Sequence, residues 1–197
     1  MPAAGNVAEE DQARAGLYRL LAAFLTAPPS ADLLDATSGL TGDGTVLGAA
    51  LGELARAAKA TSSAAAADEY QDLFIGLTRG EILPYASYYL TGFLNEKPLA
   101  RLRSDMARLE IAADRSFSEP EDHAAAVLES MAGLIDGTFG RAIDIDDQRA
   151  FFESHIASWA PLMFRDVAQA KSAHLYRAVA ALGTAFLTIE REAFQRD

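Results

Sequence analysis

Hydrophobic residues recur every three or four positions along most of this chain, which is the spacing of one face of an α-helix. The first stripe covers residues 17–25 and stops at Pro28-Pro29, because a proline pair cannot continue a helix. A short helix is predicted to begin at Ser30, and the glycine-rich stretch 38–45 is typical of a loop. The helical spacing then resumes and is predicted to stop near Gly76.

The middle of the chain is less regular. Residues 77–94 contain Gly80, Pro84 and Gly92, and the next clear helix is predicted to start at Pro98, a residue favoured in a first helical turn. The periodicity breaks again near residues 114–120. This break is too short for a domain linker, so we interpret it as a hinge-like loop between two closely packed halves, about 9–113 and 118–195.

Beyond the break, Ser118 and Glu121 have the spacing of a capping box, with Pro120 in the first turn of the predicted helix. Gly137 is expected to end that helix. Further helices are predicted around 146–158 and 161–169, and the most regular stripe covers residues 175–194. No strand-like alternation appears. The sequence therefore predicts a single compact all-α bundle of about eight to ten helices without an internal repeat.

Charge and composition narrow the classes of partner. The 197 residues include 17 Lys and Arg against 28 Asp and Glu, giving a formal charge of −11. Such a surface repels phosphate backbones and attracts a basic peptide, and no helix is expected to carry a basic face, so nucleic acid is not an expected partner. The first residues lack the pattern of a secretory signal. The longest uncharged stretch, 82–95, is too short for a membrane span. We expect a soluble, cytoplasmic protein.

Catalytic motifs are missing from the sequence. There is no cysteine, no nucleophile elbow and no phosphate-binding glycine loop. None of the histidines His123, His155 and His174 has the spacing of a helical metal motif, and partly buried, unliganded histidines are the simpler interpretation. We therefore expect no catalytic residues, no metal, no cofactor and no enzyme activity.

Two groups of residues nevertheless attract attention. Acidic residues at 119, 121 and 122 suit a first helical turn, but His123 follows them, and a cation there would oppose the helix dipole. The second group is Tyr85, Tyr88 and Tyr89. Aromatic residues at this spacing usually belong to a core, yet three buried hydroxyls would all need partners. A groove lined by aromatic rings would suit an apolar peptide with polar ends.

The order of several motifs resembles a known family. The motifs are Glu69-Tyr70-Gln71-Asp72-Leu73-Phe74-Ile75-Gly76, Pro84-Tyr85-Ala86-Ser87-Tyr88-Tyr89-Leu90, Glu119-Pro120-Glu121-Asp122-His123, Leu128-Glu129-Ser130-Met131, and the C-terminal set Phe152, His155, Trp159, Leu175-Tyr176 and Phe186…Glu190. Together they resemble the TorD/DmsD family of redox-enzyme maturation chaperones, over roughly residues 18–190.

The resemblance implies a cytoplasmic chaperone that binds the twin-arginine signal peptide and the apo-form of a molybdopterin oxidoreductase, delaying export until the cofactor is inserted. It implies that Asp122 and His123 contact or shape the peptide site, for instance by pairing Asp122 with the arginines. Glu119 and Pro120 would fix the loop. The other implied site residues, which would line or support the same groove, are Tyr85, Ser87 and Tyr88.

The sequence also departs from the family pattern. Leu77-Thr78-Arg79-Gly80 replaces the usual Gly-Pro pair, and Ala86 stands where a glutamate is common. These departures leave the client open between enzymes of the formate dehydrogenase and DMSO-reductase types. One alternative function is an accessory protein that binds a guanine nucleotide or molybdopterin dinucleotide. Another is a helical protein that only self-associates, and the chain could be a monomer or a homodimer.

Overall fold

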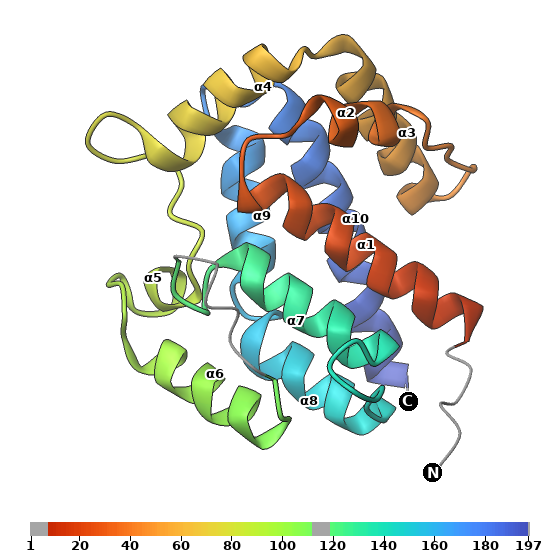
Figure 1. The fold of residues 1–197 in the computed structure, drawn as a ribbon, viewed down its shortest axis with the longest axis vertical. Helices are drawn as coiled ribbons and strands as arrows, with labels where there is room; N and C mark the ends of the chain where they lie inside the picture. Colours follow the sequence, from red (N-terminus) through yellow and green to blue (C-terminus); the bar gives the residue numbers. More distant parts are fainter. Residues whose placement is uncertain (1–7, 112–118, 197) are drawn as a thin grey trace. The chain divides into compact units, whose positions relative to one another are not determined.

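The computed structural model describes residues 8–111 and 119–196, and within these ranges the chain forms α-helices, one π-helical turn and no strand (Figure 1). The predicted all-α fold is confirmed. In chain order the elements are α1 Glu9–Thr26, α2 Ala31–Ser38, α3 Val46–Ala60, α4 Ser63–Tyr70, the π-helical turn Gln71–Ile75, α5 Ala86–Thr91, α6 Lys97–Arg108, α7 Ala124–Asp136, α8 Ile145–His155, α9 Ala160–Gln169 and α10 Leu175–Arg196. None of these helices is long and apolar enough to cross a membrane.

Backbone contacts divide the chain into two units, each made of two separate segments. Unit one holds Met1–Ala23 and Tyr85–Trp159, and unit two holds Phe24–Pro84 and Ala160–Asp197. The chain therefore passes from one unit to the other three times. Most of the hinge expected near residues 114–120 lies outside the described residues, so the division into halves at 113 and 118 stays a prediction.

Local signals place most helix ends where the sequence predicts them. α1 ends at Thr26, just before the proline pair. The hydroxyl of Ser30 accepts a hydrogen bond from the N–H of Leu33 (3.1 Å) and so caps α2. Gly137 ends α7 with a φ of 80°, a conformation that glycine adopts without strain.

The predicted start of α7 is wrong. The helix begins at Ala124 rather than inside the acidic stretch, and its N-cap is His123. Ser118, the first residue of the expected capping box, lies outside the described residues. Glu121, the other member, pairs with Arg103 instead of reaching back to a helix N-terminus. A long-range partner thus takes the carboxylate that the local pattern assigned to a cap.

Unit two is organised around α10, which packs against α9 and α3. Gly183 of α10 lies against the ring of Phe164 in α9, where an added Cβ would come within 2.6 Å of the ring. The hydroxyl of the buried Tyr176 donates to the carbonyl of Phe24 (2.6 Å). Burial raises the pKa of Tyr176 well above its usual range, so the phenol stays protonated and keeps this hydrogen bond.

The N-terminus of α10 is capped from a distant part of the chain. Glu69, a buried residue in α4, accepts hydrogen bonds at Oε1 from the N–H groups of His174 (2.7 Å) and Tyr176 (2.8 Å). Its Oε2 accepts from the N–H of Leu175 (3.0 Å). The first N–H groups of a helix have no partner within the helix, and a carboxylate complements the dipole there. Glu69 therefore fixes α4 to the start of the longest helix.

The segment after the π-helical turn folds back onto it. Gly76 has a φ of 63°, and a Cβ at this residue would lie 2.2 Å from the carbonyl oxygen of Arg79. The N–H of Ile82 then donates to the carbonyl of Leu73 (2.8 Å). Glycine is required at residue 76 because the chain reverses within a few residues.

Candidate functional site

The acidic loop, residues 119–123, is held against the start of α5 within unit one. The N–H of Ala86 donates to the carbonyl of Asp122 (3.0 Å). Tyr85 and His123 form an isolated antiparallel bridge. The backbone therefore brings together the tyrosine-rich motif and the Glu-Pro-x-Asp-His motif, whose residues Tyr85 and Glu119 lie 34 positions apart in the sequence.

Asp122 forms the tightest link in this site. Its side chain is buried, and its Oδ2 accepts hydrogen bonds from both the N–H (2.8 Å) and the hydroxyl of Ser87. Ser87 is itself fully buried. With only 1% of its surface exposed, Asp122 is covered by the protein itself and is not open to a peptide arginine. The geometry favours a role for Asp122 in shaping the site over direct contact with a peptide.

Glu119 is the member of the acidic loop that faces solvent. Its Oε2 accepts a hydrogen bond from the hydroxyl of the half-buried Tyr85 (2.5 Å). The ring of Tyr85 in turn packs edge-on against His123, with the ring centres 5.1 Å apart. An aromatic ring, a hydroxyl and an exposed carboxylate therefore adjoin one another at the rim of the loop.

Glu121 ties the loop to α6. Its Oε2 accepts from two nitrogens of Arg103, at 2.7 and 2.9 Å. The hydrogen bond from Arg103 lowers the pKa of Glu121 below its usual value, so this pair stays charged. Arg103 could not be found from the sequence, because no motif or spacing relates a residue of α6 to a loop 18 residues later.

His123 is buried and caps α7. Its ring Nδ1 accepts a hydrogen bond from the backbone N–H of Ala125 (3.2 Å). The backbone N–H of His123 donates to the carbonyl of Pro120 (2.9 Å) and closes the turn. Burial lowers the pKa of His123 to about 4, despite the nearby Glu119 and Asp122. A neutral imidazole does not oppose the helix dipole, so the conflict seen in the sequence disappears in the fold.

The buried His123 should make the protein less stable in mild acid. Because its folded pKa lies below the unfolded value of 6.5, only the unfolded state gains a proton between pH 6.5 and 4. The stability that this pKa difference contributes is fully present above pH 6.5. The free energy of unfolding therefore declines by about 2 kcal/mol on going from pH 7 to pH 5. We expect His123→Asn, which keeps an acceptor for Ala125 but cannot titrate, to lose correspondingly less stability over this interval.

Urea unfolding of both proteins at pH 7 and pH 5 measures this difference. Burial also lowers the pKa of His155, but that residue is present in both proteins and its effect cancels. Equal losses of stability in the two proteins would show that His123 does not titrate abnormally.

The three tyrosines are half-buried rather than enclosed in a core. The ring of Tyr88 lies edge-on to that of Tyr89, with centres 6.0 Å apart, and Tyr89 lies 5.9 Å from Trp159. Tyr85 and Tyr88 are three residues apart at the start of α5. The structure thus places three half-buried aromatic rings at α5, and the peptide groove that the sequence suggests for them stays a prediction.

The histidines outside the acidic loop are placed as ordinary structural residues. His155 bonds through Nε2 to Oδ2 of Asp105 (2.8 Å), and His174 precedes α10 and gives its N–H to Glu69. Within residues 8–111 and 119–196, no group of three His, Asp or Glu side chains is arranged to hold a metal ion.

Comparison with known proteins places this geometry in context. The family model described as nitrate reductase delta subunit matches residues 42–165, which include both halves of the site. Chaperone protein TorD of Vibrio cholerae serotype O1 is 31% identical over 128 residues, covering 61% of this chain and 58% of TorD. Chaperone protein TorD of Aliivibrio fischeri is 30% identical over 131 residues, covering 62% of this chain and 60% of that protein. The chain therefore matches less than two thirds of the length of these relatives.

A solved structure shows the same fold. It belongs to a candidate redox enzyme maturation protein from Archaeoglobus fulgidus, with a TM-score of 0.57 and 23% sequence identity. The alignment covers 90% of this chain and 93% of that chain. At this identity the likeness concerns the fold alone.

Proposed function

Because the chain belongs to the nitrate reductase delta subunit family, we propose that it is a maturation chaperone for a molybdenum-containing redox enzyme and not itself an enzyme. The match across both motifs of the site carries this proposal. Relatives that share about 30% of the aligned residues bear the name chaperone protein TorD. The site, whose charged and hydroxyl groups hold a loop in place, suits peptide binding better than a reaction.

The ligand we propose is the twin-arginine signal peptide of the apo-enzyme, held in the cytoplasm until the cofactor is inserted. An arginine of the leader would pair with Glu119, the exposed carboxylate of the loop, beside the hydroxyl of Tyr85. The apolar stretch of the leader would follow Tyr88. Asp122, His123, Ser87 and Pro120 would act indirectly, by holding the loop and the start of α5.

Calorimetric titration with leader peptides tests this function. Leaders from enzymes of the formate dehydrogenase and DMSO-reductase types should be compared, because either type could be the client enzyme. We expect saturable binding that weakens about tenfold or more in Glu119→Gln, since a hydrogen bond to a charged group contributes roughly 1.5–3 kcal/mol. Glu153→Gln, which removes an exposed carboxylate of α8 instead, should bind like the unaltered protein.

Two results would count against the proposal. If no leader binds, the signal peptide is not the ligand. A thermal shift with guanine nucleotides in the same preparation would then point to the nucleotide-binding alternative, because a ligand of the folded state raises its melting temperature. If leaders bind equally to Glu119→Gln, the peptide lies elsewhere on the protein.

A further inference from the structure

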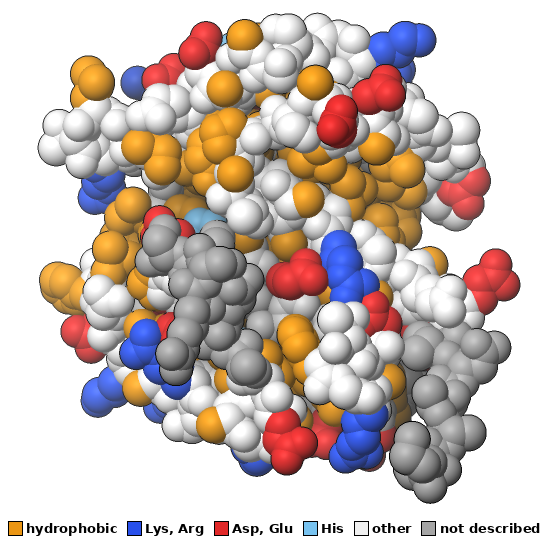
Figure 2. All heavy atoms as spheres, viewed as in Figure 1, with side chains coloured by type: hydrophobic (Ala, Val, Ile, Leu, Met, Phe, Trp, Pro, Cys, Tyr) orange, Lys and Arg blue, Asp and Glu red, His pale blue; other side chains and the backbone are white. Residues whose placement is uncertain are grey.

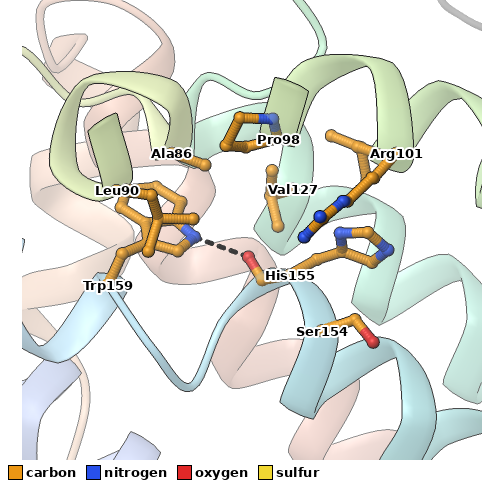
Figure 3. Close-up of a pocket in the computed structure, with 9 residues that line it drawn as sticks. Ala86, Leu90, Pro98, Arg101, Val127, Ser154, His155 and Trp159 are labelled. Carbon is orange, nitrogen blue, oxygen red and sulfur yellow. Dashed lines mark hydrogen bonds between the residues drawn. The ribbon is translucent and has the colours of Figure 1, made fainter. Parts of the chain in front are cut away.

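Unit one contains a small pocket between α5, α6, α7 and α8, on the face of α5 that carries Ala86 and Leu90 (Figure 3). Its apolar wall includes Leu90, Val127 and Trp159. The volume of about 360 Å³ includes open solvent at the mouth, so the enclosed part is much smaller and suits at most one side chain. None of the residues assigned to the leader site lines this pocket.

The two aromatic polar side chains of the pocket, Trp159 and His155, have partners within the protein. Nε1 of Trp159 donates to the carbonyl of His155 (2.6 Å), and Nε2 of His155 bonds to Asp105 (2.8 Å). Burial keeps His155 neutral by lowering its pKa. Arg101 has no hydrogen bond or ion pair with any residue that the structure describes, and Figure 3 shows its guanidinium extending toward His155. The pocket therefore presents one permanent positive charge above an apolar wall.

This charge belongs to a basic face of α6, contrary to the expectation from the sequence that no helix carries one. Lys97, Arg101 and Arg108 are four and seven residues apart and so lie on one side of the helix. Arg108 lies near two carboxylates, whereas Lys97 is exposed and, like Arg101, lacks such a partner among the described residues. Figure 2 shows Lys and Arg side chains gathered over α6. In a chain of charge −11, two cations with no carboxylate partner in residues 8–111 and 119–196 point to an anionic ligand.

Exposed apolar side chains follow the pocket residue Leu90 along the chain. Leu90 lines the pocket and is 43% exposed, and the segment between α5 and α6 exposes Phe93 (69%) and Leu94 (44%). Figure 2 shows hydrophobic side chains at the surface over this segment. Exposed apolar residues that cluster at a protein surface mark an interaction site.

We infer that this pocket and its rim bind a peptide segment of a partner protein in which an apolar side chain lies next to a carboxylate. The apolar side chain enters between Leu90 and Trp159, and the carboxylate pairs with Arg101. A twin-arginine leader has the opposite charge, so this surface is a second site with a different ligand. The inference does not depend on the proposed function.

Trp159 allows a direct test because it is the only tryptophan in the chain and lines the pocket. The probe is an acetylated hexapeptide of alternating leucine and aspartate, which does not fluoresce in the tryptophan range. The uncharged control peptide has asparagine in place of each aspartate. At about 0.1 M salt, charges more than roughly 10 Å apart are screened, so the cations of α6 act on the peptide more than the net charge of the chain.

We expect the aspartate peptide to change the emission of Trp159 in a saturable way, and the asparagine peptide to bind about tenfold more weakly. Arg101→Gln should weaken the aspartate peptide by a similar factor and leave the asparagine peptide unchanged. Arg141→Gln, which removes an exposed arginine outside the pocket, is the matched control. Ser154→Phe, at an exposed residue of the pocket mouth, should obstruct both peptides.

Circular dichroism should confirm that each variant is folded, and the substituted side chains are exposed in all three. The inference is overturned if the aspartate peptide does not bind at millimolar concentration. It is equally overturned if both peptides bind alike, or if Arg101→Gln binds the aspartate peptide as well as Arg141→Gln does.

Discussion

Replacing Glu69 with alanine should lower the free energy of unfolding by roughly 3–5 kcal/mol, because three backbone N–H groups lose their acceptor at once. Each buried donor left without a partner costs about 1–3 kcal/mol. The hydrogen bonds from Leu175 and Tyr176 are buried, and the one from His174 is partly buried. The start of α10 also loses the negative charge that complements its dipole. Chemical unfolding followed by circular dichroism measures the effect.

Glu69→Gln separates geometry from charge. Its amide oxygen can still accept from His174 and Tyr176, but its NH₂ group would face the N–H of Leu175, so a smaller loss of about 1–3 kcal/mol is expected. Glu53→Ala, at an exposed residue of α3, serves as the control and should change stability by no more than about 0.5 kcal/mol. If Glu69→Ala behaves like this control, the three hydrogen bonds do not hold α10.

Asp122→Ala should have the next largest effect, a loss of about 2–4 kcal/mol, because the buried N–H and hydroxyl of Ser87 both lose their acceptor. The acidic loop would also lose its side-chain attachment to α5. A double-mutant cycle that combines Asp122→Ala with Ser87→Ala isolates the interaction of the two side chains. We expect a coupling energy of about 1–2 kcal/mol. Additive effects of the two substitutions would mean that the side chains do not interact.

The same variants show whether Asp122 shapes the site or contacts the ligand. Asp122→Asn retains one acceptor oxygen for Ser87 but carries no charge. If Asp122 only shapes the site, Asp122→Asn should bind leader peptides better than Asp122→Ala, in proportion to the retained stability. Calorimetric titration of both variants under conditions where both are folded provides the comparison. Equal loss of binding in both would instead assign the negative charge a direct role.

Local signals explain why much of the fold could be predicted from the sequence. The helix end before Pro28-Pro29, the cap at Ser30 and the stop at Gly137 depend on residues within one turn of the feature itself. Helical periodicity similarly located the long C-terminal helix. Such features are fixed by backbone sterics and nearby hydrogen bonds, so a sequence pattern is sufficient to find them.

Features that depend on distant partners could not be predicted. The capping-box pattern failed because Glu121 pairs with Arg103, and the role of Glu69 depends on N–H groups more than a hundred residues away. For the candidate site, the resemblance grouped Tyr85 with the acidic loop correctly, but only the structure shows that Asp122 is buried while Glu119 is exposed. Burial of a polar side chain leaves no mark in a single sequence.

The interleaving of the two units constrains how this protein can be made. While the chain emerges from a ribosome, neither unit is contiguous, so unit one must wait for Trp159 and unit two for α10. Glu69 and His174 are 105 residues apart, which at about 5–20 residues per second corresponds to roughly 5–20 s of synthesis. During that interval water must hydrate the carboxylate that α10 will later bury. A nascent chain interrupted after Trp159 would have every segment of unit one, together with a unit two that lacks both α9 and α10.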